Sequence, residues 1–298
     1  MSVDIIYNNC PACHSNAIAF QLKAKDFTVS GDVFEIWKCN NCSLRFTQDI
    51  PSANSFGRYY QSENYISHSN TSKGLVNRLY HSVRAITLRQ KARLLRNTTG
   101  LSTGTLLDIG AGTGAFAAFM RSEGWRVTAL EPDESARTVA REQNNICLLS
   151  LNEFFSLPEA SFDAITMWHV LEHVHALHEY MEQLKKLLSA NGRAFIAVPN
   201  YTSYDAAFYK EYWAAYDVPR HLYHFSPKAM KMLVEKHGLK LAGIRPMWFD
   251  SFYVSLLSEK YRTGKQNLLR GAWTGLLSNI KAIRNKENCS SLIYIISA

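Results

Sequence analysis

Residues 105–114, Thr-Leu-Leu-Asp-Ile-Gly-Ala-Gly-Thr-Gly, decide the fold of this chain. The first five residues form an apolar run typical of a buried strand, and the run ends in a glycine-rich loop. A helix pattern follows over Ala115–Glu123 and stops at Gly124, and a second strand pattern follows over Arg126–Leu130. This order predicts the opening β-α-β unit of a doubly wound α/β sheet. The glycine loop is then expected at the carboxyl edge of the sheet, where such sheets bind ligands.

The glycine loop alone fits two kinds of cofactor. It satisfies the G-x-G-x-x-G/A pattern of dinucleotide-binding proteins, with Glu131 at about the right distance to bind a ribose. Asp108 separates the two interpretations, because a carboxylate two residues before the first glycine would repel a pyrophosphate. S-adenosylmethionine has no phosphate and carries an ammonium and a sulfonium. Asp108 therefore favours S-adenosylmethionine over a nicotinamide dinucleotide.

Residues 106–114 resemble motif I of the class I S-adenosylmethionine-dependent methyltransferases. Further segments appear in that family's order: Glu131 resembles the acid that holds the ribose hydroxyls, residues 161–174 resemble the fourth strand and its exit, and residues 191–200 resemble the fifth strand. The resemblance extends from about residue 100 to the C-terminus and implies a Rossmann-like, seven-stranded doubly wound sheet. The expected cofactor-binding residues are Asp108, Gly110, Ala111, Gly112, Gly114, Glu131, Pro132, Ser150, Leu151 and Trp168.

Two further resemblances concern the acceptor. Residues 217–227, Asp-Val-Pro-Arg-His-Leu-Tyr-His-Phe-Ser-Pro, are similar to the subfamily grouped with ubiquinone-biosynthesis O-methyltransferases. The N-terminal four-cysteine segment resembles that of deoxysugar C-methyltransferases, although those enzymes carry a further C-terminal domain for which this chain has no room. Together these resemblances imply a small-molecule acceptor that is methylated at a hydroxyl or at an activated carbon.

The remaining pattern places the other elements of the sheet. We expect a third strand over Ile146–Leu149 and a final strand over Ser291–Ser297, the latter antiparallel beside the sixth strand at Leu239–Ile244. Residues 247–290 are then an insertion between the last two strands. The expected helices are Glu134–Asn144, Leu177–Ser189 and Pro227–His237, the last with Ser226 as its N-cap.

The six cysteines divide into two groups by position. Four form two C-x-x-C pairs separated by 25 residues, whereas Cys147 and Cys289 stand alone. In a reducing compartment this spacing is typical of a zinc site, and four thiolates leave no coordination position open for chemistry. We therefore expect a structural zinc ribbon, with a redox dithiol or a segment without metal as the alternatives. The expected zinc ligands are Cys10, Cys13, Cys39 and Cys42.

These features predict the domain organisation. We place the zinc ribbon at residues 1–48, a helical linker or lid at 49–99 and the class I methyltransferase domain at 100–298. From Leu75 onward, apolar residues recur at helical spacing among arginines and lysines, which predicts a basic amphipathic helix. We interpret its charges as a solvated face. An acidic partner, or peripheral contact with a membrane surface, is the alternative.

The segment 200–225 is rich in aromatic residues and leaves the fifth strand above the expected methyl-donor pocket. We interpret it as a lid over the substrate, and the alternative is a satellite core packed on the ribbon or linker. Aromatic walls would suit a ring, a sugar face or a lipid quinone alike. The expected substrate-binding residues are Tyr201, Trp213 and Arg220.

Histidines are the expected general bases. Methyl transfer from a sulfonium is an in-line displacement, and a hydroxyl acceptor must also lose a proton. With a reference pKa of ~6.5, histidine suits this task near neutral pH, and the candidates are His169, His221 and His224. Residues 169–173 also spell H-x-x-E-H, the inverzincin motif. Because the first histidine directly follows a strand, we expect no catalytic metal there.

Composition limits the class of protein. The chain has 298 residues, 47% of them hydrophobic, and 33 basic against 25 acidic residues give a net charge of +8. This excludes disordered and coiled-coil classes. The apolar runs are strand-sized and the N-terminus lacks a signal-peptide pattern, so we expect a cytoplasmic protein without a transmembrane span. The alternatives are a nucleic-acid-modifying methyltransferase and a zinc-ribbon binding module with a non-catalytic Rossmann domain. Because no lysine- or arginine-rich block is present, we do not expect nucleic acid as the substrate.

Overall fold

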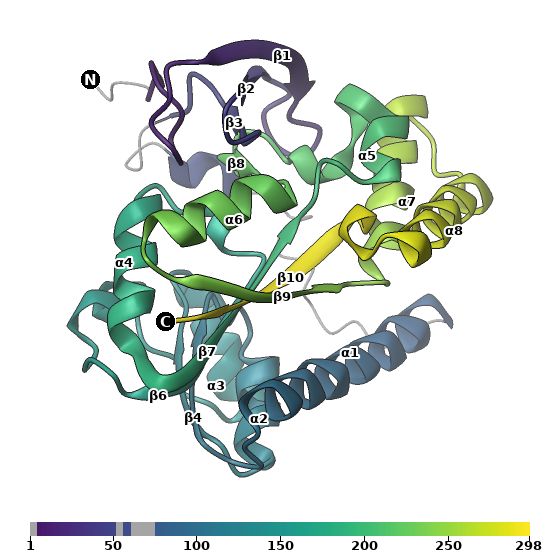
Figure 1. The fold of residues 1–298 in the computed structure, drawn as a ribbon. Helices are drawn as coiled ribbons and strands as arrows, with labels where there is room; N and C mark the ends of the chain where they lie inside the picture. Colours follow the sequence, from purple (N-terminus) through teal and green to yellow (C-terminus); the bar gives the residue numbers. More distant parts are fainter. Residues whose placement is uncertain (1–4, 52–55, 61–74) are drawn as a thin grey trace.

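The computed structural model describes residues 5–51, 56–60 and 75–298. Its central element is a six-stranded sheet of order β5-β4-β6-β7-β10-β9 (Figure 1). The first four of these strands are parallel to one another, and β10 is antiparallel to both of its neighbours. The strands span Thr105–Ile109 (β4), Arg126–Leu130 (β5), Phe162–Trp168 (β6), Leu188–Pro199 (β7), Lys240–Pro246 (β9) and Ser291–Ser297 (β10).

The opening β-α-β unit forms as predicted, with α2 over Ala115–Ser122 between β4 and β5. The prediction for the end of the chain is also confirmed, because β10 inserts antiparallel beside β9. Ser226 caps α6 (Pro227–Lys236), since its hydroxyl oxygen accepts a hydrogen bond from the Ala229 N–H.

The predicted seven-stranded sheet is wrong by one strand, because residues 146–149 do not form one. Only Leu149 pairs with β5: its N–H donates to the Ala129 carbonyl at 2.9 Å, and its carbonyl accepts from Glu131 at 3.0 Å. The chain then turns at Ser150 into the short helix η2 (Leu151–Ser156). Leu149 is 43% exposed, whereas Ile146 is buried against Ala129 and Ala140 without strand pairing, so this run packs as an irregular segment.

Helices cover both faces of the central sheet (Figure 1). On one face, α4 (Leu177–Leu187) and α6 share a core with strand residues such as Leu107 and Ile196. On the other face, α1 (Leu75–Thr99) and α2 share a core with the alternate residues, such as Leu106 and Phe195. This period of two along each strand is what a sheet buried on both faces requires. The helix α3 spans Glu134–Asn144 and packs beside α2.

A second sheet joins the N-terminal segment to the rest of the molecule. Its order is β1-β2-β3-β8, and β8 comes from the far part of the chain. The strands span Ile18–Lys25 (β1), Val33–Cys39 (β2), Arg45–Thr47 (β3) and Tyr223–His224 (β8). The predicted boundary at residue 48 therefore cuts through one sheet.

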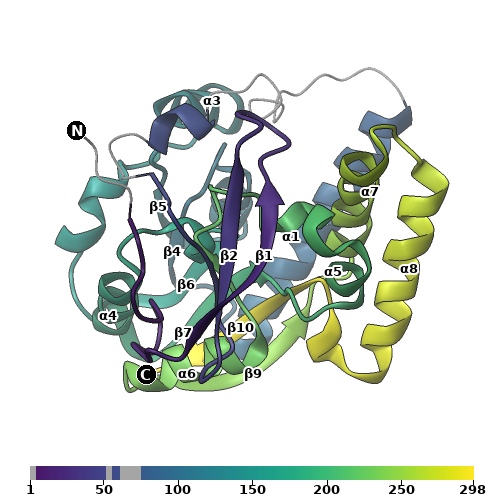
Figure 2. The same cartoon turned by 90° about the horizontal axis from the view of Figure 1, so that it is seen from above.

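The insertion 247–290 forms two helices, α7 (Asp250–Thr263) and α8 (Leu268–Arg284), joined by a short turn. Figure 2 places α8 at the outer edge of the molecule, beyond α7 and α5 (Tyr204–Tyr209). The predicted linker helix is α1, while residues 52–55 and 61–74 of that linker lie outside the described residues. The remaining short helices are η1 (Phe56–Tyr60), η3 (Leu171–His173), η4 (Lys210–Tyr212), η5 (Ala214–Tyr216) and η6 (Lys286–Asn288).

Candidate active site

The glycine loop between β4 and α2 turns sharply at the carboxyl edge of the sheet. Gly110 and Gly112 have φ values of 68° and 55°, in the left-handed region that favours glycine. A Cβ at Gly110 would lie 2.4 Å from Cγ2 of Val170, whereas the space beside Gly112 is open. Glu131 closes the loop from the end of β5, because its Oε2 accepts a hydrogen bond from the Gly112 N–H at 2.7 Å. A ligand could therefore approach the backbone of the loop at Gly112.

Asp108 lies near the end of β4 and is 1% exposed. Its Oδ1 accepts a hydrogen bond from the Thr166 hydroxyl at 2.6 Å, but its Oδ2 has no hydrogen-bond partner among the described residues. Burial raises the pKa of Asp108 to about 6, against the opposing effects of Thr166 and Lys91. A buried carboxylate oxygen without a partner is unfavourable. Asp108 therefore fits a ligand that brings a cationic donor to this point.

Lys91 on α1 lies close to Asp108, which the sequence did not predict. Its ammonium is 4.1 Å from the centroid of the Trp168 ring at the end of β6. Burial lowers the pKa of Lys91 to about 8, while the charges of Asp108 and Asp250 oppose this shift. From the helical pattern alone, Lys91 is interpreted as one of the solvated charges of α1. Only the packing of α1 against the sheet brings it to the carboxyl edge.

The strand register brings the expected cofactor residues to one edge. Asp108 pairs with Ala129 on one side and with Thr166 on the other, so the residues that follow β4, β5 and β6 meet there. Around this edge lie Asp108, Gly110, Ala111, Gly112, Gly114, Glu131, Pro132, Ser150, Leu151 and Trp168.

His169 follows β6 and lies between two carboxylates. Its Nε2 is 3.0 Å from Oδ2 of Asp250, and its Nδ1 is 3.4 Å from Oε1 of Glu172. Burial lowers the pKa of His169, but the hydrogen bond to Asp250 and the negative charges of Asp250 and Glu172 outweigh this effect and raise the pKa to about 10. At neutral pH the ring is therefore an imidazolium, which cannot accept a proton. This placement does not fit the prediction that His169 is a general base.

Glu172, His173 and His221 form a cluster in which one ligand atom from each lies within 4.8 Å of the others. His173 Nδ1 donates to the Arg220 carbonyl at 3.0 Å, and His221 Nδ1 donates to the Ala215 carbonyl at 2.8 Å, because a carbonyl can only accept. The lone pair of each neutral ring is then on Nε2. Glu172 is fully buried, and neither of its carboxylate oxygens has a hydrogen-bond partner in the described part of the chain.

This cluster can do two kinds of chemistry. Burial is the largest of the causes that lower the pKa of His173 to about 4, so His173 is neutral at pH 7. A neutral imidazole beside a carboxylate can accept a proton from a hydroxyl, and a set of two imidazoles and a carboxylate can hold a divalent metal ion. The set differs from the H-x-x-E-H motif of the sequence, because His221 joins Glu172 and His173 while His169 pairs with Asp250.

His224 lies within β8 and is 3% exposed. Its Nε2 is 3.2 Å from the Thr47 hydroxyl, and its ring meets the Tyr216 ring edge-on. Burial lowers the pKa of His224 well below its usual value. His224 thus belongs to the pairing between β3 and β8, which does not fit a role as general base for an acceptor.

The aromatic segment 200–225 packs mainly as a core. Tyr201 is 8% exposed and donates its hydroxyl to the Ser43 carbonyl in the ribbon. Trp213 is 2% exposed and donates its ring N–H to Asp205 Oδ2 at 2.8 Å. Both rings share a cluster with residues of the β1–β2 hairpin. The placement fits the satellite-core interpretation and does not fit Tyr201 or Trp213 as an acceptor wall.

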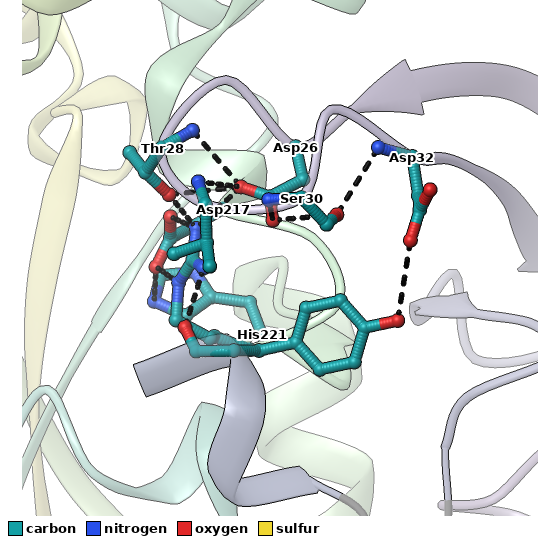
Figure 3. Close-up of polar contacts among 9 residues, drawn as sticks. Asp26, Thr28, Ser30, Asp32, Asp217 and His221 are labelled. Carbon is teal, nitrogen blue, oxygen red and sulfur yellow. Dashed lines mark hydrogen bonds and ion pairs between the residues drawn. The ribbon is translucent and has the colours of Figure 1, made fainter. Parts of the chain in front are cut away.

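Arg220 lies in a buried ionic network and is 1% exposed. Its Nη2 is 2.7 Å from Oδ1 of Asp217 and 3.1 Å from Oδ1 of Asp26. Figure 3 shows Asp26 and Thr28, from the turn between β1 and β2, facing Asp217. The guanidinium donates to the carboxylates of Asp26 and Asp217, the Thr28 hydroxyl and the Tyr59 carbonyl. Arg220 therefore joins the β1–β2 hairpin to the segment that contains His221. This structural role does not fit the prediction that Arg220 binds the acceptor.

We predict that Arg220→Lys lowers the free energy of unfolding by about 1–3 kcal/mol. Lysine keeps the charge but lacks the planar fork that spans both carboxylates, so a buried oxygen loses its partner. Equilibrium unfolding in urea measures the change, with the exposed Arg141→Lys on α3 as the matched control. Equal stability of the two variants would contradict this account of the network.

The four cysteines of the two C-x-x-C pairs meet in space as predicted. The Sγ atoms of Cys10 and Cys42 are 3.5 Å apart, those of Cys13 and Cys39 are 3.6 Å apart, and all four lie within 4.8 Å of one another. A tetrahedral zinc ion with Zn–S bonds of ~2.3 Å would separate its sulfur ligands by about 3.8 Å. The cluster therefore has the size and the donor set of a structural zinc site.

Comparison with known proteins identifies the family. Residues 80–242, more than half of the chain, match the family model described as a methyltransferase domain, so the protein belongs to that family. The ubiquinone biosynthesis O-methyltransferase of Glaesserella parasuis is 35% identical over 117 residues, which are 36% of this chain and 50% of that protein. The protein of the same name from Nitrosococcus oceani is 26% identical over 184 residues, covering 57% and 76% respectively. This chain thus spans about half the length of the first of these relatives.

Solved structures share the fold. The phosphoethanolamine N-methyltransferase 2 of Haemonchus contortus, in complex with S-adenosyl-L-methionine, superposes with a TM-score of 0.52 at 16% identity over 85% of this chain and 62% of that chain. A SAM-dependent methyltransferase from Archaeoglobus fulgidus gives 0.50 at 17% identity over 72% and 94%. The Rossmann-like α/β fold predicted from the sequence is confirmed.

Proposed function

We propose that this protein transfers a methyl group from S-adenosylmethionine to a small-molecule acceptor. The observation that carries this proposal is the buried, unpartnered Oδ2 of Asp108 near the ammonium of Lys91. The amino-acid end of S-adenosylmethionine bears an ammonium and a carboxylate, which complement these two charges. A pyrophosphate would instead meet the Asp108 carboxylate. Membership of the methyltransferase domain family supports the same conclusion.

Glu131 is our candidate for binding the ribose of the donor. Its Oε1 accepts from the Asp133 N–H at 3.0 Å and its Oε2 from the Gly112 N–H. Each carboxylate oxygen keeps a second lone pair, so the side chain can still accept from two ribose hydroxyls. Ser150 and Leu151 directly follow Leu149, the residue that pairs with the edge strand β5. They lie at the same edge of the sheet and would border the adenine.

We assign proton removal from a hydroxyl acceptor to His221. The donor, when bound, supplies an electrophilic methyl group on its sulfonium. The Ala215 carbonyl fixes the Nδ1–H of His221, so Nε2 is the atom that takes the proton. Asp217 Oδ2 is 3.9 Å from this Nε2, and its negative charge stabilises the imidazolium that forms.

The relatives' names and the resemblances in the sequence support two classes of acceptor. The name ubiquinone biosynthesis O-methyltransferase favours an aromatic hydroxyl, whereas the four-cysteine ribbon favours a nucleotide-linked sugar with an activated carbon. A trial of quinol, catechol and nucleotide-sugar acceptors with labelled donor tests these classes directly. Transfer to an oligonucleotide alone would favour the nucleic-acid alternative.

We also propose that Cys10, Cys13, Cys39 and Cys42 hold one structural Zn²⁺. Zinc thiolates persist in reducing conditions, which supports a cytoplasmic location. We keep the proposed domain boundaries at residues 48 and 99. The strand β8 comes from the methyltransferase domain but completes the sheet of the ribbon.

The donor site can be tested by its pH dependence. Because the pKa of Asp108 is raised to about 6, its carboxylate is charged above this pH and neutral below it. We predict that affinity for S-adenosylmethionine falls as the pH drops below about 6, and that Asp108→Asn weakens binding about 10–100-fold at pH 7 and removes this acid limb. Isothermal titration calorimetry between pH 5 and 7 measures both effects.

The exposed Glu159→Gln is the matched control and should bind the donor as the wild type does. Titration with NAD in place of S-adenosylmethionine should give no heat of binding. If the wild type bound NAD, or if Asp108→Asn kept full affinity for S-adenosylmethionine, the proposed cofactor would be wrong.

A further inference from the structure

The helix α8 packs with its small residues inward. The face that packs against α7 and α5 consists of buried glycine, serine, threonine and alanine, and its glycines let the backbones of α8 and α7 approach closely. A Cβ at Gly271 would lie 2.9 Å from Cα of Leu256, and one at Gly275 would lie 2.9 Å from Cα of Phe252. The buried residues of α8 are Gly271, Thr274, Gly275, Ser278 and Ala282.

The opposite face of α8 carries large apolar side chains that are exposed. They recur at intervals of four and three residues, so they form one stripe about 21 Å long, which we call the α8 stripe. A helix on the surface of a domain normally has the reverse arrangement, with its large apolar residues toward the core. The stripe consists of Leu269 (86% exposed), Trp273 (59%), Leu276 (40%), Ile280 (48%) and Ile283 (69%).

Basic residues surround this stripe. Residues 250–290 contain seven lysines and arginines against three acidic residues, a net charge of +4. Two of the acids are already paired within the protein, Asp250 with His169 and Glu259 with Arg262 and Arg270. At about 100° per residue, Arg270, Lys281 and Arg284 lie along one flank of the stripe. We call residues 250–290 the α7–α8 hairpin, and its exposed basic residues are Lys260, Lys265, Arg270, Lys281, Arg284 and Lys286.

We propose that the α8 stripe docks on the surface of a lipid bilayer that contains anionic lipids. The apolar side chains would enter the boundary between headgroups and acyl chains, with Trp273 at the level where tryptophan is enriched. The flanking lysines and arginines would contact the anionic headgroups. Among the described residues no helix is both long and apolar enough to cross a membrane, so α8 would lie in the plane of the surface.

The charge also argues against a second copy of the chain as the occupant. A two-fold contact through the α8 stripe would place two hairpins of net charge +4 against each other. Like charges at such an interface repel, whereas an anionic bilayer attracts the same residues. The complementarity therefore favours lipid.

The proposal is tested with the full chain and vesicles of two compositions, phosphatidylcholine alone and phosphatidylcholine with about one third phosphatidylglycerol. We expect flotation with the anionic vesicles, decreasing as salt rises, and little flotation with the neutral ones. The double variant L269S/I283S should reduce binding by about tenfold or more. The double variant K281Q/R284Q should reduce binding to the anionic vesicles several-fold.

The matched control is Phe20→Ser, because Phe20 is 52% exposed on β1, away from the hairpin. It should float as the wild type does, and all variants should keep the wild-type thermal midpoint, since the changed side chains are at the surface. Absence of flotation, or equal flotation by L269S/I283S, would overturn the proposal. So would a wild-type dimer in light scattering that becomes monomeric in L269S/I283S, because the stripe would then be a protein interface.

Discussion

In the His221→Ala variant, the single-turnover rate of methyl transfer should fall by ~10²–10⁴ while the affinity for S-adenosylmethionine stays unchanged. The reason is geometric. Among the histidines expected to act as bases, His221 alone combines a fixed Nδ1–H with membership of the cluster around Glu172. His169 is an imidazolium between two carboxylates, and His224 is buried in a strand pair. Single-turnover kinetics with the acceptor found in the trial above measure the effect.

The matched control is His237→Ala, because His237 ends α6 and is not part of the cluster. It should keep the wild-type rate. A His221→Ala variant whose loss appears in the acceptor KM, with the chemical step intact, would mean that His221 only positions the segment around it. A near-normal rate would mean that the acceptor needs no histidine base.

Cys39→Ser should lower the zinc content below one ion per chain and unfold most of the first 48 residues. A ribbon of this size has too little core to remain folded without its metal, and structural zinc contributes roughly 10–16 kcal/mol in isolated zinc-finger peptides. Donor affinity should stay largely intact, because the glycine loop belongs to the central sheet. Metal analysis, circular dichroism and donor calorimetry on one preparation measure these effects.

The structure adds an effect on the acceptor side. The Thr47 hydroxyl donates to the His221 carbonyl at 2.7 Å, and the Thr47 N–H donates to the Leu222 carbonyl at 2.9 Å. Loss of the ribbon would release this segment, so methyl transfer should fall in Cys39→Ser even though the donor binds. Cys147→Ser is the control, since Cys147 is exposed and lies outside the cluster. Full zinc content in Cys39→Ser would exclude this cysteine as a ligand.

Local signals in the sequence predicted much of the fold. The strand–loop–helix–strand pattern of residues 105–130 and the spacing of the cysteine pairs depend on neighbouring residues, and both are confirmed. The strand predicted at 146–149 failed because an apolar run forms a strand only if a neighbour pairs along its length, and only Leu149 pairs.

The candidate site was predictable only in part, because long-range contacts decide what its side chains do. Arg220 meets Asp26, 194 positions away in the sequence, and no local pattern reveals that pairing. Lys91 belongs to a helix whose charges look solvated until α1 is packed on the sheet. His169 stands beside a strand end, as expected, but its partner Asp250 comes from the insertion.

The strand β8 has a consequence for how inhibition by chelators should be interpreted. It lies in the ribbon's sheet, pairs with β3 through Arg45 and Phe46, and begins two residues after His221. If a chelator removes the zinc ion that we propose for the ribbon, it would therefore loosen the segment that we assign to proton removal, although the four cysteines form a separate cluster. Loss of turnover in EDTA would then look like dependence on a catalytic metal. Its real cause would be that the segment around His221 no longer has the folded ribbon packed against it. Re-adding zinc should restore turnover with the time course of ribbon refolding, and magnesium should not.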